Sequence, residues 1–141
     1  FSKDKQNYDF TTNLFHKEKG TTGNVLIKGA LKGESKSVFR GMIKINKEAQ
    51  QTNSFLSDHS LMLSKEAQSY SIPSLEIDAN DVKASHGATM GKPDEEELFY
   101  LMARGLDRKK AEEVLIAGFF TPVIEDIKYL KEKIASIILV K

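Results

Sequence analysis

The sequence predicts a mainly β protein with a helical C-terminal part, and three observations support this fold class. Up to about Gly91 the chain is rich in β-branched residues, Ser, Asn and Gly, and its apolar runs are short. These runs recur between polar or small residues, as strands separated by turns do. After Pro93 the composition changes to helix-forming residues with apolar positions three and four apart. We therefore expect two units, residues 1–92 and 93–141.

Four apolar runs mark the strands expected in the first unit. They begin at Val25, Met42, Leu61 and Leu75, and each is followed by polar or small residues. Loose recurrence of this kind is compatible with a β-solenoid, in which each coil stacks on the previous one. It is equally compatible with a β-sandwich, and the spacing alone does not decide between the two folds.

Three helices are expected in the second unit. Residues 94–97 have the pattern of a capping box, and Gly105 supplies a stop for a first helix over 94–104. A second helix is expected over 107–119. A third is predicted to begin at Thr121, with Pro122 at its first helical position. Its expected apolar stripe is Ile127, Leu130, Ile134, Ile137 and Ile138, and Lys128, Lys131 and Lys133 lie off that stripe.

The composition of the 141 residues excludes several classes of function. The net charge of +1 produces no large field that would attract nucleic acid or an anionic membrane, so we expect neither as a partner. Because the chain has no cysteine, it provides neither disulfides nor thiolate metal ligands. The longest apolar run, 134–140, is far shorter than the roughly 20 residues that cross a bilayer. The sequence has no phosphate-binding loop and no nucleophile elbow.

The three histidines are the candidates for metal chemistry. His16 and His59 are expected at the surface or in turns, whereas His86 lies in a run that alternates if it is extended. Val82, Ala84, His86 and Ala88 would then share one face of a strand. A histidine among small apolar side chains has open space beside it, which a second surface or a ligand can fill. The competing interpretation is a hydrogen-bonded histidine at a packed seam.

Glu76 and Asp78 are a second candidate site, because paired carboxylates on one strand face are used by glycoside-cleaving enzymes with a β-solenoid fold. The competing interpretation is a solvated polar face opposite Leu75 and Ile77.

Several ordered motifs resemble the SufB/SufD family of iron–sulfur cluster assembly proteins. Residues 73–91 are similar to the family signature, and residues 97–106 are similar to its LFYL-x-x-RG helix. Residues 39–45, 49–52 and 59–64 match further pieces upstream. The resemblance covers roughly residues 9–126.

This resemblance implies the final coils of a right-handed parallel β-helix, followed by a small three-helix module. It implies a non-catalytic scaffold in the cytoplasm, or in the plastid stroma of a plastid-bearing organism. The implied partners are a SufC-type ABC ATPase, docked through the helical end, and a second SufB/SufD-type subunit, paired through the last strands. The residues carried over for ATPase docking are Leu98, Phe99, Tyr100, Arg104 and Phe119. Members of the family are longer, and a start at Phe1 indicates an excised or processed fragment.

One departure from the family pattern concerns the residues around His86. Family members often have Cys-Ser-His where this chain has Ala84, Ser85 and His86. That cysteine and the histidine would lie on one strand face, about 7 Å apart. The resemblance implies His86 as a ligand of a transient iron–sulfur cluster at the subunit interface, with no cofactor on the isolated chain. The missing thiolate and Gly87 favour a SufD-like chain, and a divergent SufB-like homodimer stays open.

Overall fold

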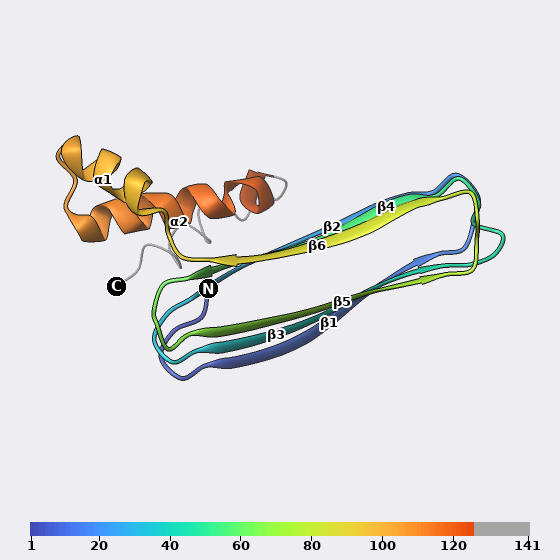
Figure 1. The fold of residues 1–141 in the computed structure, drawn as a ribbon, viewed down its shortest axis with the longest axis horizontal. Coiled ribbons are helices and arrows are strands. Elements are labelled where there is room, and N and C mark those ends of the chain that lie inside the picture. Colours follow the sequence, from blue (N-terminus) through green and yellow to red (C-terminus); the bar gives the residue numbers. More distant parts are fainter. Residues whose placement is uncertain (126–141) are drawn as a thin grey trace.

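The computed structural model describes residues 1–125, and in that range the chain forms six strands followed by two helices (Figure 1). The strands are β1 (Asn7–His16), β2 (Thr22–Leu31), β3 (Lys36–Ile45), β4 (Asn53–Met62), β5 (Gln68–Ile77) and β6 (Lys83–Gly91). The helices are α1 (Glu95–Ala103) and α2 (Arg108–Glu125). The change from strand to helix thus falls between Gly91 and Glu95, as the composition predicts. The division of the chain into two independent units stays a prediction.

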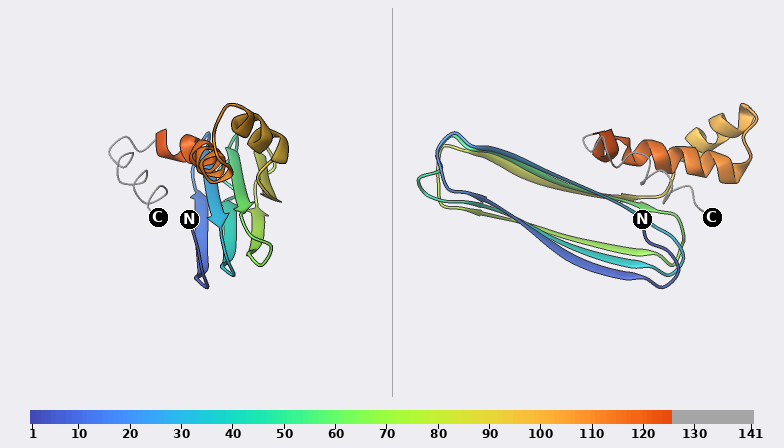
Figure 2. Two further views of the ribbon diagram at one scale, coloured as in Figure 1. Left: turned by 90° about the vertical axis from the view of Figure 1, so that its left-hand side faces the viewer. Right: turned by 180° about the vertical axis from the view of Figure 1, so that it is seen from behind.

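Consecutive strands alternate between two parallel sheets, which have the orders β1-β3-β5 and β2-β4-β6. The two sheets face each other as separate layers (Figures 1 and 2). One coil therefore contains two strands, and equivalent residues of successive coils are about 30 apart. The Ser54 hydroxyl, for example, donates a hydrogen bond to the Gly23 carbonyl, 31 residues earlier. All pairings are parallel, so the fold is the parallel β-helix type and not a β-sandwich.

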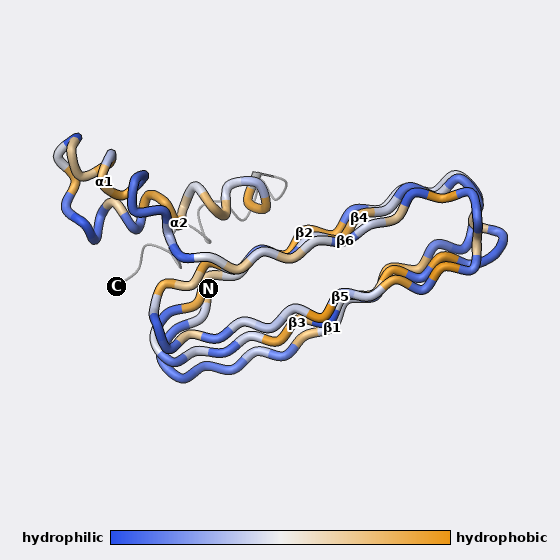
Figure 3. The backbone as a smooth tube through the Cα atoms, viewed as in Figure 1, coloured by the Kyte–Doolittle hydropathy of each residue, from blue (hydrophilic) through white to orange (hydrophobic). Residues whose placement is uncertain are grey.

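The apolar core lies between the sheets, in the half of the β-helix that is farther from the helices (Figure 3). It is formed by the buried side chains of Phe39, Ile43, Ile45, Ala49 and Leu56. The parallel register stacks side chains of successive coils, so that Leu14, Ile43 and Leu75 form one column. Gly41 allows close packing inside it, because a Cβ there would lie 2.6 Å from Leu56 Cδ1. Burial of these stacked side chains holds the coils together.

The half of the β-helix interior nearer the helices is more polar. Ser37 and Ser69 are in register on one sheet, and Ser60 on the other is buried. Asp58 belongs to this region, and its side chain is only 3% exposed. Burial in this interior raises the pKa of the Asp58 carboxyl, and contacts with Ser71 and His59 offset part of the effect.

Replacing Asp58 with Asn is expected to stabilise the fold at neutral pH. A raised pKa means that the carboxyl stabilises the native state when protonated, and that this stabilisation is lost as pH rises through the folded-state pKa. Because Asn cannot ionise, the advantage of D58N should be present at pH 7 and should shrink toward pH 4. Urea unfolding at both pH values measures the difference. D81N, at an exposed position, is the control; equal effects of D58N at pH 7 and pH 4 would contradict this assignment.

Helix α1 begins and ends as its sequence predicts. Asp94 is the N-cap, and its carboxylate accepts a hydrogen bond of 2.7 Å from the Glu96 backbone N–H and a longer one from Glu97. Three glutamates lie in the first turn, where their negative charge interacts favourably with the positive end of the helix dipole. Gly105 follows with a φ of 97°, a conformation that glycine adopts without a steric cost.

The third helix does not begin at Thr121. Helix α2 continues through Thr121 and Pro122 to Glu125, and the rest of the predicted third helix, with its stripe from Ile127 to Ile138, lies outside the described residues. The Thr121 hydroxyl donates a 3.1 Å hydrogen bond to the Ala117 carbonyl four residues earlier, which is the geometry of a residue inside a helix and not of a cap. Phe120 and Ile124, on either side of Pro122, both pack on the β-helix. This packing outweighs the tendency of proline to break the helix.

Helix α2 lies along the end of the β2-β4-β6 sheet (Figures 1 and 2). Ile116 and Phe120 bury Ala30, with Leu61, Leu63, Phe119 and Ile124 around them. Lys28 also joins the two parts, since its ammonium group donates a 2.7 Å hydrogen bond to the Phe119 carbonyl and lies 4.5 Å from the centre of the Phe119 ring. Neither helix of residues 1–125 is both long enough and apolar enough to span a membrane.

Candidate functional site

His86 lies on β6, which is the edge strand of its sheet. In the register it is opposite Leu56, a fully buried core residue, and Ala84 of the same strand packs on the core. Since alternate residues of a strand share a face, His86 is on the inner face of the β-helix. Its side chain is nevertheless exposed, because β6 belongs to the last coil and no strand of residues 1–125 covers it. The alternation predicted for residues 82–88 places these residues correctly.

The last coil leaves other inner-face side chains open as well. Ile77 of β5 is 39% exposed, whereas Ile45, its partner in the preceding coil, is fully buried. Met90 of β6 is likewise exposed, whereas its partner Ser60 is buried. We call the surface formed by the inner faces and edges of β5 and β6 the open end. It combines apolar side chains with unpaired strand edges, a combination that proteins normally cover.

The backbone of β6 also presents hydrogen-bonding groups at this edge. The Lys83 N–H donates a 2.8 Å hydrogen bond to the Thr52 carbonyl at the start of β4. Because successive residues of a strand direct their N–H and C=O groups to opposite sides, those of His86 and Ala88 face away from β4. The open end can therefore extend the sheet by pairing with a further strand.

His86 does not belong to a ready-made metal site within the described residues. Residues 1–125 contain no group of three or more His, Asp or Glu side chains that could hold a metal ion, and the sequence contains no cysteine. The imidazole offers at most one nitrogen atom to a metal, at an exposed surface. A site of this kind fits an iron–sulfur cluster only if a second chain contributes the other ligands.

The expectation that His16 lies at the surface or in a turn is wrong. His16 is buried at the end of β1, and its Nδ1 and Nε2 lie 2.8 Å from the Thr21 hydroxyl and 3.0 Å from the Ser54 hydroxyl. Burial lowers the pKa of this imidazole. Its role is structural, in a polar network at the turn between β1 and β2. His59 is at the surface, as expected, and forms a hydrogen bond with Thr89.

The carboxylates of Glu76 and Asp78 do not form a catalytic pair. Glu76 is on the outer face of β5 in an ion pair with Lys44, which raises the pKa of that lysine through a hydrogen bond and charge attraction. Asp78 lies beyond the end of β5, where its backbone N–H donates to Ile45. The solvated polar face is therefore the better interpretation of these two residues.

The residues considered for ATPase docking fall into two groups. Leu98 is fully buried and packs inside the molecule, and Phe119 is held between Lys28 and Phe120. Phe99 and Tyr100, by contrast, are 69% and 55% exposed. Arg104 stacks on the Tyr100 ring at 4.3 Å from its centre. Exposed aromatic side chains next to an arginine are typical of protein contact surfaces.

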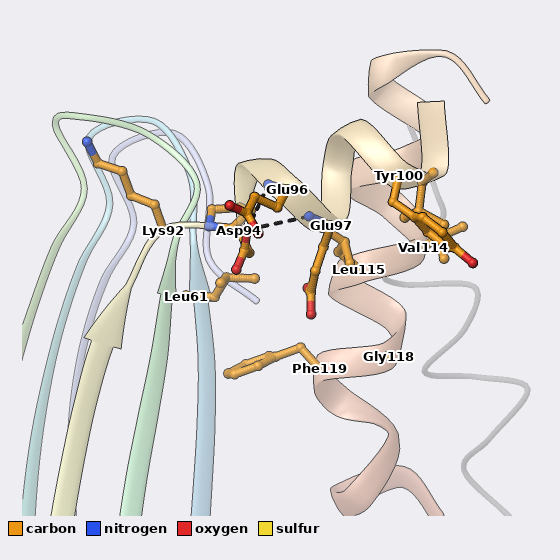
Figure 4. Close-up of a pocket in the computed structure, with 12 residues that line it drawn as sticks. Leu61, Lys92, Asp94, Glu96, Glu97, Tyr100, Val114, Leu115, Gly118 and Phe119 are labelled. Atoms are coloured by element: carbon orange, nitrogen blue, oxygen red, sulfur yellow. Dashed lines mark hydrogen bonds between the residues drawn. The ribbon is translucent and has the colours of Figure 1, made fainter. Parts of the chain in front are cut away.

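A groove of about 850 Å³ separates the helices from the end of the β-helix (Figure 4). Leu61 of β4 lies on one side, and Tyr100, Leu101, Val114, Leu115 and Phe119 of the two helices form the other walls. Asp94, Glu96 and Glu97 line its edge. No local pattern in the sequence indicated this groove, because its walls come from strands and helices far apart in the chain.

Comparison with known proteins identifies the family. A family model described as the SufBD core domain of the SUF system for FeS cluster assembly matches residues 1–119. This chain belongs to the SufBD family. SufD of Bacillus subtilis is 37% identical over 136 residues, which cover 95% of this chain and 31% of that protein. SufD of Escherichia coli is 33% identical over 120 residues, covering 85% of this chain and 28% of that protein.

A SufBD family protein of Mycobacterium leprae is 34% identical over 135 residues, covering 90% of this chain and 34% of that protein. The chain thus spans roughly a third of the length of these curated relatives. The resemblance noted from residues 73–91 and 97–106 is confirmed at the level of the family, whose described role is iron–sulfur cluster assembly.

Proposed function

We propose that this chain is part of a SufD-type, non-catalytic scaffold subunit of an iron–sulfur cluster assembly complex. The open end of the β-helix, with His86 on its inner face, is the observation that carries this proposal. The absence of cysteine and two relatives named SufD support the SufD type. The cytoplasm, or the stroma of a plastid, is the proposed location.

The first proposed partner is a second SufB/SufD-type subunit that covers the open end. Such a subunit would bury Ile77 and Met90 and would supply backbone partners for the free edge of β6. His86 would then lie in the seam between two subunits. In this position its neutral imidazole would bind the assembling cluster as cargo, and thiolates of the partner would complete the ligand set.

The second proposed partner is a SufC-type ABC ATPase, which would dock on the helical end. Phe99, Tyr100 and Arg104 would contact it directly, because their side chains are accessible. Leu98 would support the surface from beneath, since it is buried. Phe119 is partly buried and would support it from the wall of the groove. The ATPase would provide the nucleotide chemistry of the complex.

Replacing Phe99 with Ala is expected to weaken binding of the ATPase about tenfold or more. An exposed aromatic anchor that becomes buried in an interface contributes about 1–4 kcal/mol to binding. The measurement is the affinity of the purified protein for its SufC-type ATPase. Tyr70→Ala is the control, because Tyr70 is also an exposed aromatic residue but lies on β5, outside the helices. Equal affinities of F99A and the wild type for the ATPase would show that the assignment of the docking surface to Phe99 on α1 is wrong.

A further inference from the structure

Asp58 is a buried carboxyl group directly beneath the open end. It lies on the inner face of β4, in register with Ala88 of β6, which belongs to the last coil. Asp58 is only 3% exposed, whereas Ala88 is exposed on the coil above it. A carboxylate is costly to bury unless a cation or hydrogen-bond donors compensate its charge. In its ionised form, Asp58 therefore requires a partner inside the β-helix.

A second polar group near Asp58 lacks a partner as well. The Ser71 hydroxyl oxygen, on β5 of the last coil, is buried and has no hydrogen-bond partner among residues 1–125. Burial raises the pKa of the Asp58 carboxyl, and the nearby Ser71 hydroxyl offsets part of this effect. Because buried polar groups are nearly always paired, these two groups indicate a polar occupant between the sheets. A cavity of about 240 Å³, lined by Asp58, Ser37 and Ser60 among others, provides room beside them.

His86 lies within reach of the same position. It is two residues before Ala88 on β6, so its side chain projects from the same inner face as that of Asp58. With strands about 4.8 Å apart and a rise of about 3.3 Å per residue, the Cα atoms of Asp58 and His86 are separated by about 8 Å. The two side chains, each with a metal bond of about 2 Å, are long enough to span this separation.

We propose that Asp58 and His86 together bind one ferrous ion at the open end. This inference rests on the proposed function, in which His86 faces the assembling cluster, and adds a site for the iron that the cluster needs. Imidazole nitrogen and carboxylate oxygen both bind ferrous iron in proteins, whereas Mg²⁺ prefers oxygen ligands alone. The ion also supplies the positive charge that the buried carboxylate requires. Water and ligands of the second subunit complete its coordination.

Anaerobic titration of the full chain with Fe²⁺, followed by calorimetry, tests the proposal. The test variant is D58N, because asparagine keeps the size of aspartate and removes its charge. D58N and H86A are each expected to weaken Fe²⁺ binding at least about tenfold, since loss of a direct ligand costs no less than the tenfold to hundredfold typical of supporting groups. The control is D81N, the same substitution at an exposed position, and it should bind Fe²⁺ as the wild type does.

The double variant D58N/H86A tests whether the two residues share one ion. If they do, either single substitution removes most of the affinity, so the second should add little to the loss. Additive losses would indicate two separate ions and would overturn the proposal. Efficient displacement of Fe²⁺ by an equal concentration of Mg²⁺ would also contradict it, because that behaviour belongs to a site made of oxygen ligands.

Two further outcomes would overturn the proposal. One is Fe²⁺ binding by folded D58N that equals that of the wild type, and the other is wild-type binding no stronger than that of the double variant. The proposed scaffold function is measured separately, by pairing with the second subunit and by cluster formation in the complex. A loss of cluster formation in H86A with unchanged Fe²⁺ binding in D58N would therefore reject the role of Asp58 alone.

Discussion

Replacing His86 with Ala is expected to reduce cluster assembly at least about tenfold, while the protein keeps its fold and its binding to the ATPase. The side chain is exposed on the last coil, and Ala84 and Ala88 on the same face show that the strand accepts small residues. Loss of one direct ligand should cost no less than the tenfold to hundredfold typical of changes to groups that only orient a ligand. The measurement is iron–sulfur cluster content of the purified complex and cluster formation in cells.

His59→Ala is the control for this experiment, because His59 is a second accessible histidine that lies on the outer face of β4. It should leave cluster assembly unchanged. If H86A assembled clusters normally at wild-type abundance, His86 would be a packing residue, and the chain would act as a purely structural adaptor.

Replacing Ala88 with Pro is expected to abolish pairing through the open end. The N–H of Ala88 faces the free edge, so proline would remove a donor needed by an incoming strand and place its ring in the way. The backbone hydrogen bonds between β4 and β6 should survive, because they are made by the residues of β6 that alternate with Ala88. The preceding residue, Gly87, tolerates the restriction that proline imposes on its neighbour. We expect association to weaken at least about tenfold, as measured by light scattering over a range of concentrations.

Ala88→Ser is the matched control, because serine keeps the N–H group at a position where the side chain is exposed. It should associate as the wild type does. Circular dichroism and thermal unfolding of A88P check that the β-helix remains intact. Undiminished association of a folded A88P protein would place the pairing surface elsewhere.

The sequence was sufficient to predict β-structure up to about Gly91 and helices after Pro93, because these depend on local patterns. It did not predict β1 (Asn7–His16), which precedes the first apolar run at Val25. The alternation over 82–88 placed His86 on one strand face with Ala84 and Ala88, and the cap at Asp94 located the start of α1. That this face is the inner one follows only from the register with β4. The choice between β-helix and β-sandwich could not be made from spacing. The apolar runs at Val25, Met42, Leu61 and Leu75 belong to strands of alternating sheets, so their irregular intervals hide the longer interval of a complete coil.

Features that depend on contacts distant in the chain were missed. His16 looked like a surface residue because Ser54, which hydrogen-bonds it, is 38 residues away. The continuation of α2 past Pro122 depends on packing against Ala30 of β2, which has no local signature. The groove similarly arises only where Leu61 comes near the two helices.

Native mass spectrometry of the protein co-expressed with a SufC-type ATPase and a SufB/SufD-type subunit tests the central claim most directly. That claim is that this chain is a scaffold that pairs through its open end and docks the ATPase through its helices. We expect one complex that contains all three proteins, from which A88P removes the second subunit and in which F99A weakens binding of the ATPase. Recovery of the wild-type protein alone, free of both partners, would contradict it.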